Sequence, residues 1–250
     1  MPSTSPSRAE ASGAKLDAEL RRAIGQSWLA RAAGELSTAN LSSLVAHALF
    51  ESGAELDVLA LAARAVGDEL RHARLCLSLA ESYAGASLAV PSARHVELPR
   101  FGDAPETVNR LLLVVYHSCL NEGIATAFLQ ENLRLAIAPE VRDAIRELLR
   151  DDVEHARLGW AHLSSPRVDD AARAHVGAAL PVLLRLAWQA WVESNVESAL
   201  DCPEHGCLGP ARVEAVVRDA LEHLVLPGFD HVGVDTARGR DFVAQQLGRP

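Results

Sequence analysis

The sequence is poor in aromatic residues and in cysteine, and it has no excess of positive charge. Aromatic residues make up 4% of the 250 positions, and there are four cysteines. Four cysteines are too few to stabilise a chain of this length through disulfides. The formal net charge is −9, which argues against non-specific nucleic-acid binding, because such binding needs basic side chains to neutralise phosphates.

The sequence also lacks the apolar segments that are typical of membrane-spanning and secreted proteins. No apolar run reaches about 18 residues, the length that a spanning helix needs. Residues 1–15 are rich in serine, alanine and proline and contain no apolar signal-peptide core, so we expect a disordered tail there. These absences predict a cytoplasmic protein that does not engage a membrane.

What the sequence has in abundance is alanine and leucine, within a hydrophobic fraction of 49%. This composition, with few β-branched runs, favours α-helix, and a chain of this length can bury a sizeable core. We therefore predict an all-α fold. The expected helices span residues 16–50, 58–83, 105–137, 139–164, 170–200 and 210–226. We expect the first to break near Gly25, and the last to end at Pro227 and Gly228.

The segment between the second and third expected helices is long for a loop. Residues 84–104 contain Gly85, Pro91 and Pro99, which interrupt any helical pattern. A helical hairpin needs only a few connecting residues, whereas a return to the opposite end of a bundle needs about this many. We therefore predict a crossover. The expected organisation is a tail (1–15), a four-helix bundle (16–165) and a C-terminal helical extension packed on it (166–250).

Two similar octets stand out in the second and fourth expected helices. Residues 68–75 read Asp-Glu-Leu-Arg-His-Ala-Arg-Leu, and residues 151–158 read Asp-Asp-Val-Glu-His-Ala-Arg-Leu. Each octet places a carboxylate three residues before a histidine, and residues three apart lie on one face of a helix. The repeat therefore predicts two helices that each present a carboxylate and an imidazole together.

Each octet is preceded by a helix with one carboxylate on an otherwise apolar stripe. Glu35 lies 34 residues before Glu69, and Glu122 lies 30 residues before Asp152. The chain thus contains two halves of the same design. If the halves pack together, four carboxylates and two imidazoles converge.

Such a cluster suits a pair of cations. Carboxylates can bridge two metal ions and offset their charge, and mainly oxygen ligands with some nitrogen favour iron or manganese over copper or structural zinc. Without metal, four buried carboxylates would repel one another. The alternative is that these acids are core residues satisfied by arginine or by the backbone.

With these residues in view, the sequence resembles the ferritin-like superfamily, which includes bacterioferritin, rubrerythrin and the di-iron oxygenases. The resemblance covers residues 28–163 and implies a four-helix bundle that holds two metal ions. One metal would be served by Glu35 and His72 and the other by Glu122 and His155, with Glu69 and Asp152 as bridges.

The sequence departs from the family at Asp152, where glutamate is usual. Aspartate reaches about 1.3 Å less far, near one C–C bond length, so we expect either that Asp152 binds one metal only or that the second metal site is weak. Asp68 and Asp151 occupy matching positions in the octets. They are candidates to orient the imidazoles by accepting their N–H groups.

The cysteines allow two interpretations. Cys76 lies four residues after His72 and Cys119 three before Glu122, so both are expected near the cluster, either as small buried hydrophobes or as residues that shape a substrate or O₂ pocket. Residues 202–207, Cys-Pro-Glu-His-Gly-Cys, lack the spacing of a zinc site and are expected to form a connector.

The resemblance implies a di-iron oxidoreductase that activates O₂ and acts on a small organic substrate, with an external electron donor and a homodimeric state as further expectations. Manganese, or a mixed manganese–iron pair, is the alternative cofactor. The extra C-terminal helices favour an oxidase or oxygenase. A ferroxidase or iron-handling protein remains an alternative, as does a non-catalytic bundle with a degenerate metal site. A rubrerythrin-like peroxidase is disfavoured because two Cys-x-x-Cys pairs are lacking.

Overall fold

A computed structural model describes residues 16–93, 104–194 and 200–247. These residues form helices and no strand, so the prediction of an all-α fold is confirmed. The tail predicted at residues 1–15 and most of the second half of the predicted crossover lie outside the described residues.

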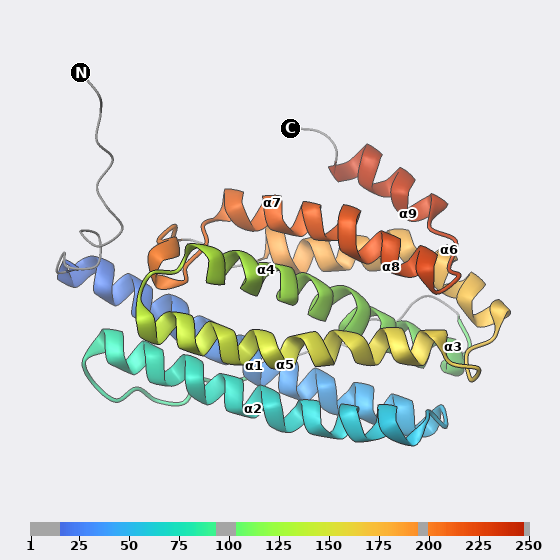
Figure 1. Ribbon diagram of the computed structural model, residues 1–250, viewed down its shortest axis with the longest axis horizontal. Helices are drawn as coiled ribbons and strands as arrows, with labels where there is room; N and C mark the ends of the chain where they lie inside the picture. The colour runs from blue at the N-terminus through green and yellow to red at the C-terminus, as the bar shows by residue number, and fades with distance from the viewer. Residues whose placement is uncertain (1–15, 94–103, 195–199, 248–250) are drawn as a thin grey trace.

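The first two helices, α1 (Ala18–Glu51) and α2 (Leu56–Ala84), form a long antiparallel hairpin (Figure 1). The predicted break near Gly25 was wrong, because α1 runs through it without interruption. A Cβ atom at Gly25 would lie 3.3 Å from the carbonyl oxygen of Ala80. The glycine therefore lets α1 approach α2 closely, and it does not end a helix.

The next two long helices also pair. The first comprises α3 (Glu106–Val114), a π-helical turn (Val115–Asn121) and α4 (Glu122–Leu135), and the second is α5 (Pro139–Ser164). The sequence predicted the whole of the first as one helix but not its π-helical turn, which ends directly before Glu122. Helix α2 ends at Gly85, as predicted, at the opposite end of the bundle from the start of α3 (Figure 1).

The C-terminal part is also helical. Its elements are α6 (Asp170–Trp188), a π-helical turn (Gln189–Glu193), a 3-10 turn (Pro203–His205), α7 (Pro210–Ala220), a π-helical turn (Leu221–Val225), α8 (Leu226–His231), α9 (Ala237–Phe242) and a final π-helical turn (Val243–Leu247). The predicted end at Pro227 and Gly228 was wrong, since both lie inside α8. Proline is tolerated in the first turn of a helical segment. A Cβ atom at Gly228 would lie 2.8 Å from the Trp160 ring, so this glycine makes room for the indole.

The helices are arranged in layers, with α1 and α2 on one side, α4 and α5 in the middle, and α6 to α8 on the other side (Figure 1). Helix α5 packs against α2 and α4, and α7 packs against α4. One hydrophobic cluster joins α3, the π-helical turn at 115–121 and α4 to the C-terminal helices. Two more clusters occupy the two ends of the α1–α2 hairpin. The polar residues of the octets lie between these two.

The stretch Glu106–Leu135 is long and apolar enough to cross a membrane, which the search for apolar runs in the sequence did not anticipate. Its most apolar window has a mean hydropathy of 1.3, and 67% of that window is buried inside the protein. A buried core helix has the same properties.

The turn formed by residues 200–209 fastens the C-terminal part to the first hairpin. Cys202 and Cys207 pair through two backbone hydrogen bonds of 2.8 and 3.2 Å. The indole Nε1 of Trp28 donates to the carbonyl oxygen of His205 at 3.1 Å, and the hydroxyl of Tyr83 bonds to Nδ1 of the same histidine at 2.6 Å. Residues of α1 and α2 thus hold this connector in place.

We expect Gly159→Ala to lower the free energy of unfolding by about 1–3 kcal/mol. A Cβ atom there would lie 2.7 Å from Sγ of Cys119 and 3.0 Å from the Cys119 backbone nitrogen, so α5 must move away from the π-helical turn. Urea denaturation measures the change. The matched control is Gly67→Ala on α2, where a Cβ atom meets nothing within 4 Å. There the higher helix propensity of alanine should raise the free energy of unfolding by about 0.5–1 kcal/mol. Equal effects would contradict this account.

We expect acidification to destabilise the protein in part through His205. Burial lowers the pKa of this imidazole, so the unfolded chain takes up a proton that the folded chain resists, and stability falls as the pH drops below the ordinary histidine value of about 6.5. The His205→Gln variant should lose less stability than the wild type between pH 7.5 and 5.5 in urea denaturation. His47→Gln, which removes an exposed histidine of α1, should retain the wild-type pH dependence.

Candidate metal centre

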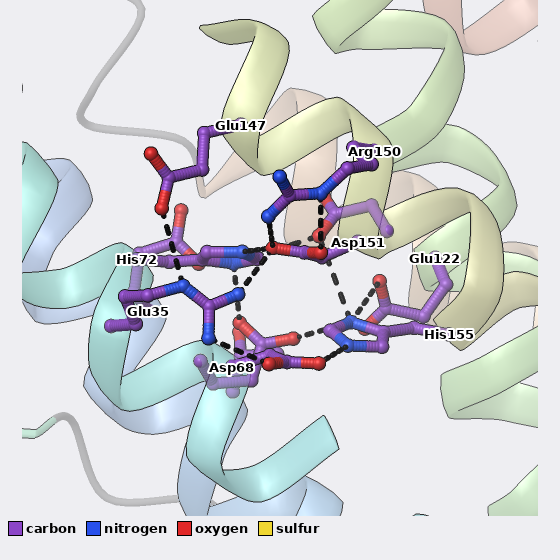
Figure 2. Close-up of polar contacts among 12 residues, drawn as sticks. Glu35, Asp68, His72, Glu122, Glu147, Arg150, Asp151 and His155 are labelled. Atoms are coloured by element: carbon purple, nitrogen blue, oxygen red, sulfur yellow. Dashed lines mark hydrogen bonds and ion pairs between the residues drawn. The ribbon is translucent and has the colours of Figure 1, made fainter. Parts of the chain in front are cut away.

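The six side chains that the sequence singled out as metal ligands come together in the middle of the bundle. They are Glu35 from α1, Glu69 and His72 from α2, Glu122 from α4, and Asp152 and His155 from α5. All are buried except Glu35, which is half-buried. The two imidazole ring centroids lie 6.0 Å apart, and the carboxylates surround them (Figure 2).

The donor atoms fall into two groups that share one residue. In one group, ligand atoms of Glu69, Glu122, Asp152 and His155 lie within 4.8 Å of one another, and in the other those of Glu35, Glu69 and His72 do. Glu69 belongs to both groups, so one carboxylate is shared between them. Asp152 belongs to one group, although its Oδ1 lies 3.6 Å from Nδ1 of His72 and 3.7 Å from Nδ1 of His155.

Several atoms in the cluster are buried without a hydrogen-bond partner in the described part of the chain. They are Nδ1 of His72, Nδ1 of His155 and Oε1 of Glu69. Glu69 Oε1 lies 2.9 Å from His155 Nδ1, and the two form an ion pair when the imidazole is protonated. Buried polar atoms normally have partners. A cation between these lone pairs would satisfy them, so the residues present fit a metal site.

The other nitrogen of each imidazole faces an aspartate of the opposite octet. His72 Nε2 lies 3.2 Å from Oδ2 of Asp151, and His155 Nε2 lies 3.3 Å from Oδ2 of Asp68. An Nε2–H that donates to a carboxylate leaves Nδ1 as the nitrogen for a metal. Asp68 and Asp151 are therefore placed to orient the imidazoles, and each does so across the interface between α2 and α5.

Arg71 ties the two aspartates together, a role that the sequence reasoning missed. Its guanidinium donates to Asp68 at 2.7 Å, to Asp151, and to Glu147 at 3.2 Å. The available signal was its position, three residues after Asp68 and next to His72. At the matching position the second octet has Glu154, so the repeat itself gave no reason to single out Arg71.

Burial makes some of the carboxylates hard to ionise without metal. Burial and the charge of Glu69 raise the pKa of Glu122 to about 8, and burial together with the charges of Glu122 and Glu69 raises the pKa of Asp152 well above its ordinary value. Without a cation, Glu122 therefore holds a proton near neutral pH, and ionisation of Asp152 is disfavoured.

In the cluster without metal, Glu69 and His155 behave as an ion pair. Burial opposes charge on both, but the His155 and His72 imidazoles lower the pKa of Glu69, and Glu69 and Glu122 raise the pKa of His155 to about 9. The cluster thus balances its negative charge with bound protons. Divalent cations could replace those protons, as is general for metal sites with titratable ligands.

His117 is a second residue that the sequence reasoning missed. It lies in the π-helical turn, fully buried, with Nε2 at 2.9 Å from Oγ of Ser42 and 3.4 Å from Oε1 of Glu122. Burial lowers its pKa to about 4, so it is neutral. The π-helical turn widens the helix beside the cluster, and such turns are common at functional sites.

A cavity of about 320 Å³ opens onto the cluster. Glu35, Glu69, Glu122 and Asp152 form one part of its wall, and Arg31 and aromatic side chains form another. The lining does not include Cys76 or Cys119. Both cysteines are fully buried in hydrophobic clusters, which is the arrangement of small core residues.

We expect Arg71→Gln to lower the free energy of unfolding by about 1 kcal/mol, because Asp68 and Asp151 lose their shared counter-charge while mostly buried. The value is reduced by the partial exposure of the guanidinium. The matched control is Arg150→Gln, which removes a more exposed partner of Asp151 and should matter much less. Urea denaturation of both variants measures the difference, and equal losses would contradict the bridging role.

No protein-family model matches this sequence, and no curated protein matches it significantly. The arrangement of the residues is therefore what points to a function. What that arrangement offers is a buried cluster of carboxylates and imidazoles that can hold metal, next to a cavity.

Proposed function

We propose that this chain is a ferritin-like dinuclear metal protein that uses O₂ to oxidise a small organic substrate. The cofactor in this proposal is two iron ions, with manganese in place of one or both as the alternative. The observation that carries the proposal is the pair of donor groups that share Glu69, because one bridging carboxylate between two sets of ligands is what a dinuclear centre requires.

The helix arrangement supports the ferritin-like part of the proposal. Two antiparallel pairs, α1 with α2 and α4 with α5, place the ligands on facing helices (Figure 1). Helix α2 ends at the opposite end of the bundle from the start of α3, as a crossover connection requires. A four-helix bundle with one such crossover is the arrangement found in ferritin-like proteins.

The choice of metal follows from the ligands. Four carboxylates and two imidazoles form a mainly hard donor set, which favours iron or manganese and disfavours copper. Glu35 and His72 would hold one ion, Glu122, Asp152 and His155 the other, and Glu69 both. A pair of such ions, when bound, supplies the redox chemistry that the protein's own side chains lack.

The residues around the ligands have roles that do not require a bound metal or cofactor. Asp68 and Asp151 orient the two imidazoles, and Arg71 fixes both aspartates. The surrounding hydrophobic clusters limit access of water. The cavity gives a small molecule a route to four of the ligands. An external electron donor is part of the proposal, because the chain offers no second redox motif that we recognise.

The cavity also favours an oxidase or oxygenase over the ferroxidase alternative. Ferrous ions do not require a space of about 320 Å³ with aromatic walls, whereas small-molecule pockets are of this size and are mostly apolar. The ferroxidase and the degenerate-site alternatives remain distinct outcomes of the experiment below.

We expect the purified protein, reconstituted anaerobically with Fe(II) or Mn(II), to bind two ions per chain. His72→Ala and His155→Ala should each lose one ion while keeping the helical content, because each imidazole belongs to a different donor group. Elemental analysis by mass spectrometry measures the metal, and circular dichroism measures the helix. The control is His47→Ala, an exposed histidine on α1, which should retain both ions.

Three other results of this experiment would change the assigned ligands or function. Two ions in both histidine variants would refute the ligand set, and less than about one ion in the wild type would identify a degenerate site. A large cage that mineralises added Fe(II), seen by size-exclusion chromatography, would identify the storage alternative.

A further inference from the structure

Arg31 is a cationic residue in the wall of the cavity, one helical turn from Glu35 on α1. Only 8% of its surface is exposed. Its guanidinium carbon lies 4.4 Å from the centroid of the Trp28 ring and 5.1 Å from that of the Phe128 ring. These two rings stabilise the buried charge and restrict the guanidinium. The position of this positive group is therefore well defined.

One nitrogen of that guanidinium has no acceptor. Nη2 donates to the carbonyl oxygen of Gly206 at 3.2 Å, whereas Nη1 is buried without a hydrogen-bond partner among the described residues. Leaving a charged donor unpaired in the interior is costly. An acceptor supplied by a ligand would remove that cost.

Three other polar residues of the cavity wall, Ser37, Thr38 and Asn121, are already engaged. The hydroxyl groups of Ser37 and Thr38 donate to the backbone of α1, to the carbonyl oxygens of Ala33 and Gly34. The amide of Asn121 donates to a backbone carbonyl and accepts from the indole of Trp191. Among these lining residues, Arg31 is the one with a donor left over for a ligand.

Charge balance indicates what kind of acceptor fits. In the proposed metal-bound state, two divalent cations offset the four carboxylates of the cluster, and the neutral imidazoles add no charge. The carboxylates of Asp68, Asp151 and Glu147 are balanced separately by the three arginines that pair with them, Arg64, Arg71 and Arg150. The positive charge of Arg31 then remains beside the cavity, and a single negative charge on a ligand would neutralise it.

From these observations we infer that Arg31 is the anion-binding residue of the cavity and that the ligand is a small organic monocarboxylate with an apolar body. The inference rests on the proposed function for its charge balance. A guanidinium matches the geometry of a carboxylate, and Leu41, Ala125, Phe128 and Trp191 provide the apolar wall.

The placement of Arg31 also gives the ligand an orientation. Residues four apart on a helix have side chains roughly 5–6 Å apart at Cβ, so a carboxylate at Arg31 lies about one turn from Glu35. The apolar body of the ligand then extends from Arg31 toward the donor groups. A carbon a few bonds from the carboxylate is thereby brought next to the metal cluster, which makes Arg31 a specificity-determining residue.

The test is calorimetric titration of the metal-loaded protein with benzoate and hexanoate, each compared with its neutral amide. We expect at least one carboxylate to bind one to one, about tenfold or more tightly than its amide. Arg31→Gln should lose that preference about tenfold or more while keeping its metal content. Arg22→Gln, which changes an exposed arginine of α1, should bind as the wild type does.

Equal affinities for the acids and their amides in the wild type would overturn the inference. An unchanged preference for the acids in Arg31→Gln would also overturn it, because the anion would then bind at the metals. If Arg31→Gln does not fold, crystals of the wild type with 4-bromobenzoate decide, because anomalous scattering from bromine shows which end faces Arg31. Metal analysis of the same samples separates the two proposals. Bound metal without acid binding refutes only this inference, and acid binding without metal refutes only the proposed function.

Discussion

The structure depends on how four carboxylates are accommodated in the middle of an apolar helical bundle. Each of them interrupts a stripe of alanine, leucine and valine, and burial makes ionisation of Glu122 and Asp152 unfavourable. Imidazoles, bound protons or cations must therefore balance them. The crossed contacts of His72 with Asp151 and of His155 with Asp68 hold the two imidazoles beside these carboxylates and join α2 to α5. The same contacts that stabilise the polar centre thus also align the helices that carry it.

Much of this could be predicted from the sequence, because regular spacing is visible there. A carboxylate three residues before a histidine must share its helix face in any α-helix, so the convergence of Glu69 and His72, and of Asp152 and His155, needed only correct helix assignments. The end of α2 at Gly85 follows from the same kind of local rule, since its φ of 68° suits glycine. The course of residues 94–103, by contrast, lies outside what the structure describes.

Features that arise from contacts between distant segments could not be predicted in this way. Gly25 and Gly228 look like helix breaks in the sequence, but each leaves room for a neighbouring helix or indole, and that neighbour is unknown until the fold is known. The π-helical turn before Glu122 leaves no distinctive residue pattern. Arg31 looks like an ordinary surface arginine in the sequence, and only the positions of Trp28, Phe128 and Gly206 show that it is enclosed.

The support of the two imidazoles is less symmetric than the repeat. The halves of the chain duplicate the ligands, but one guanidinium, that of Arg71, serves the aspartates behind both histidines. Its counterpart in the second octet, Glu154, instead pairs with Arg157 on the protein surface. Neither half can therefore be tuned alone through this contact. A change in the position of that single side chain displaces the acceptors of both imidazoles at once, so the two halves of the site are mechanically linked through one residue.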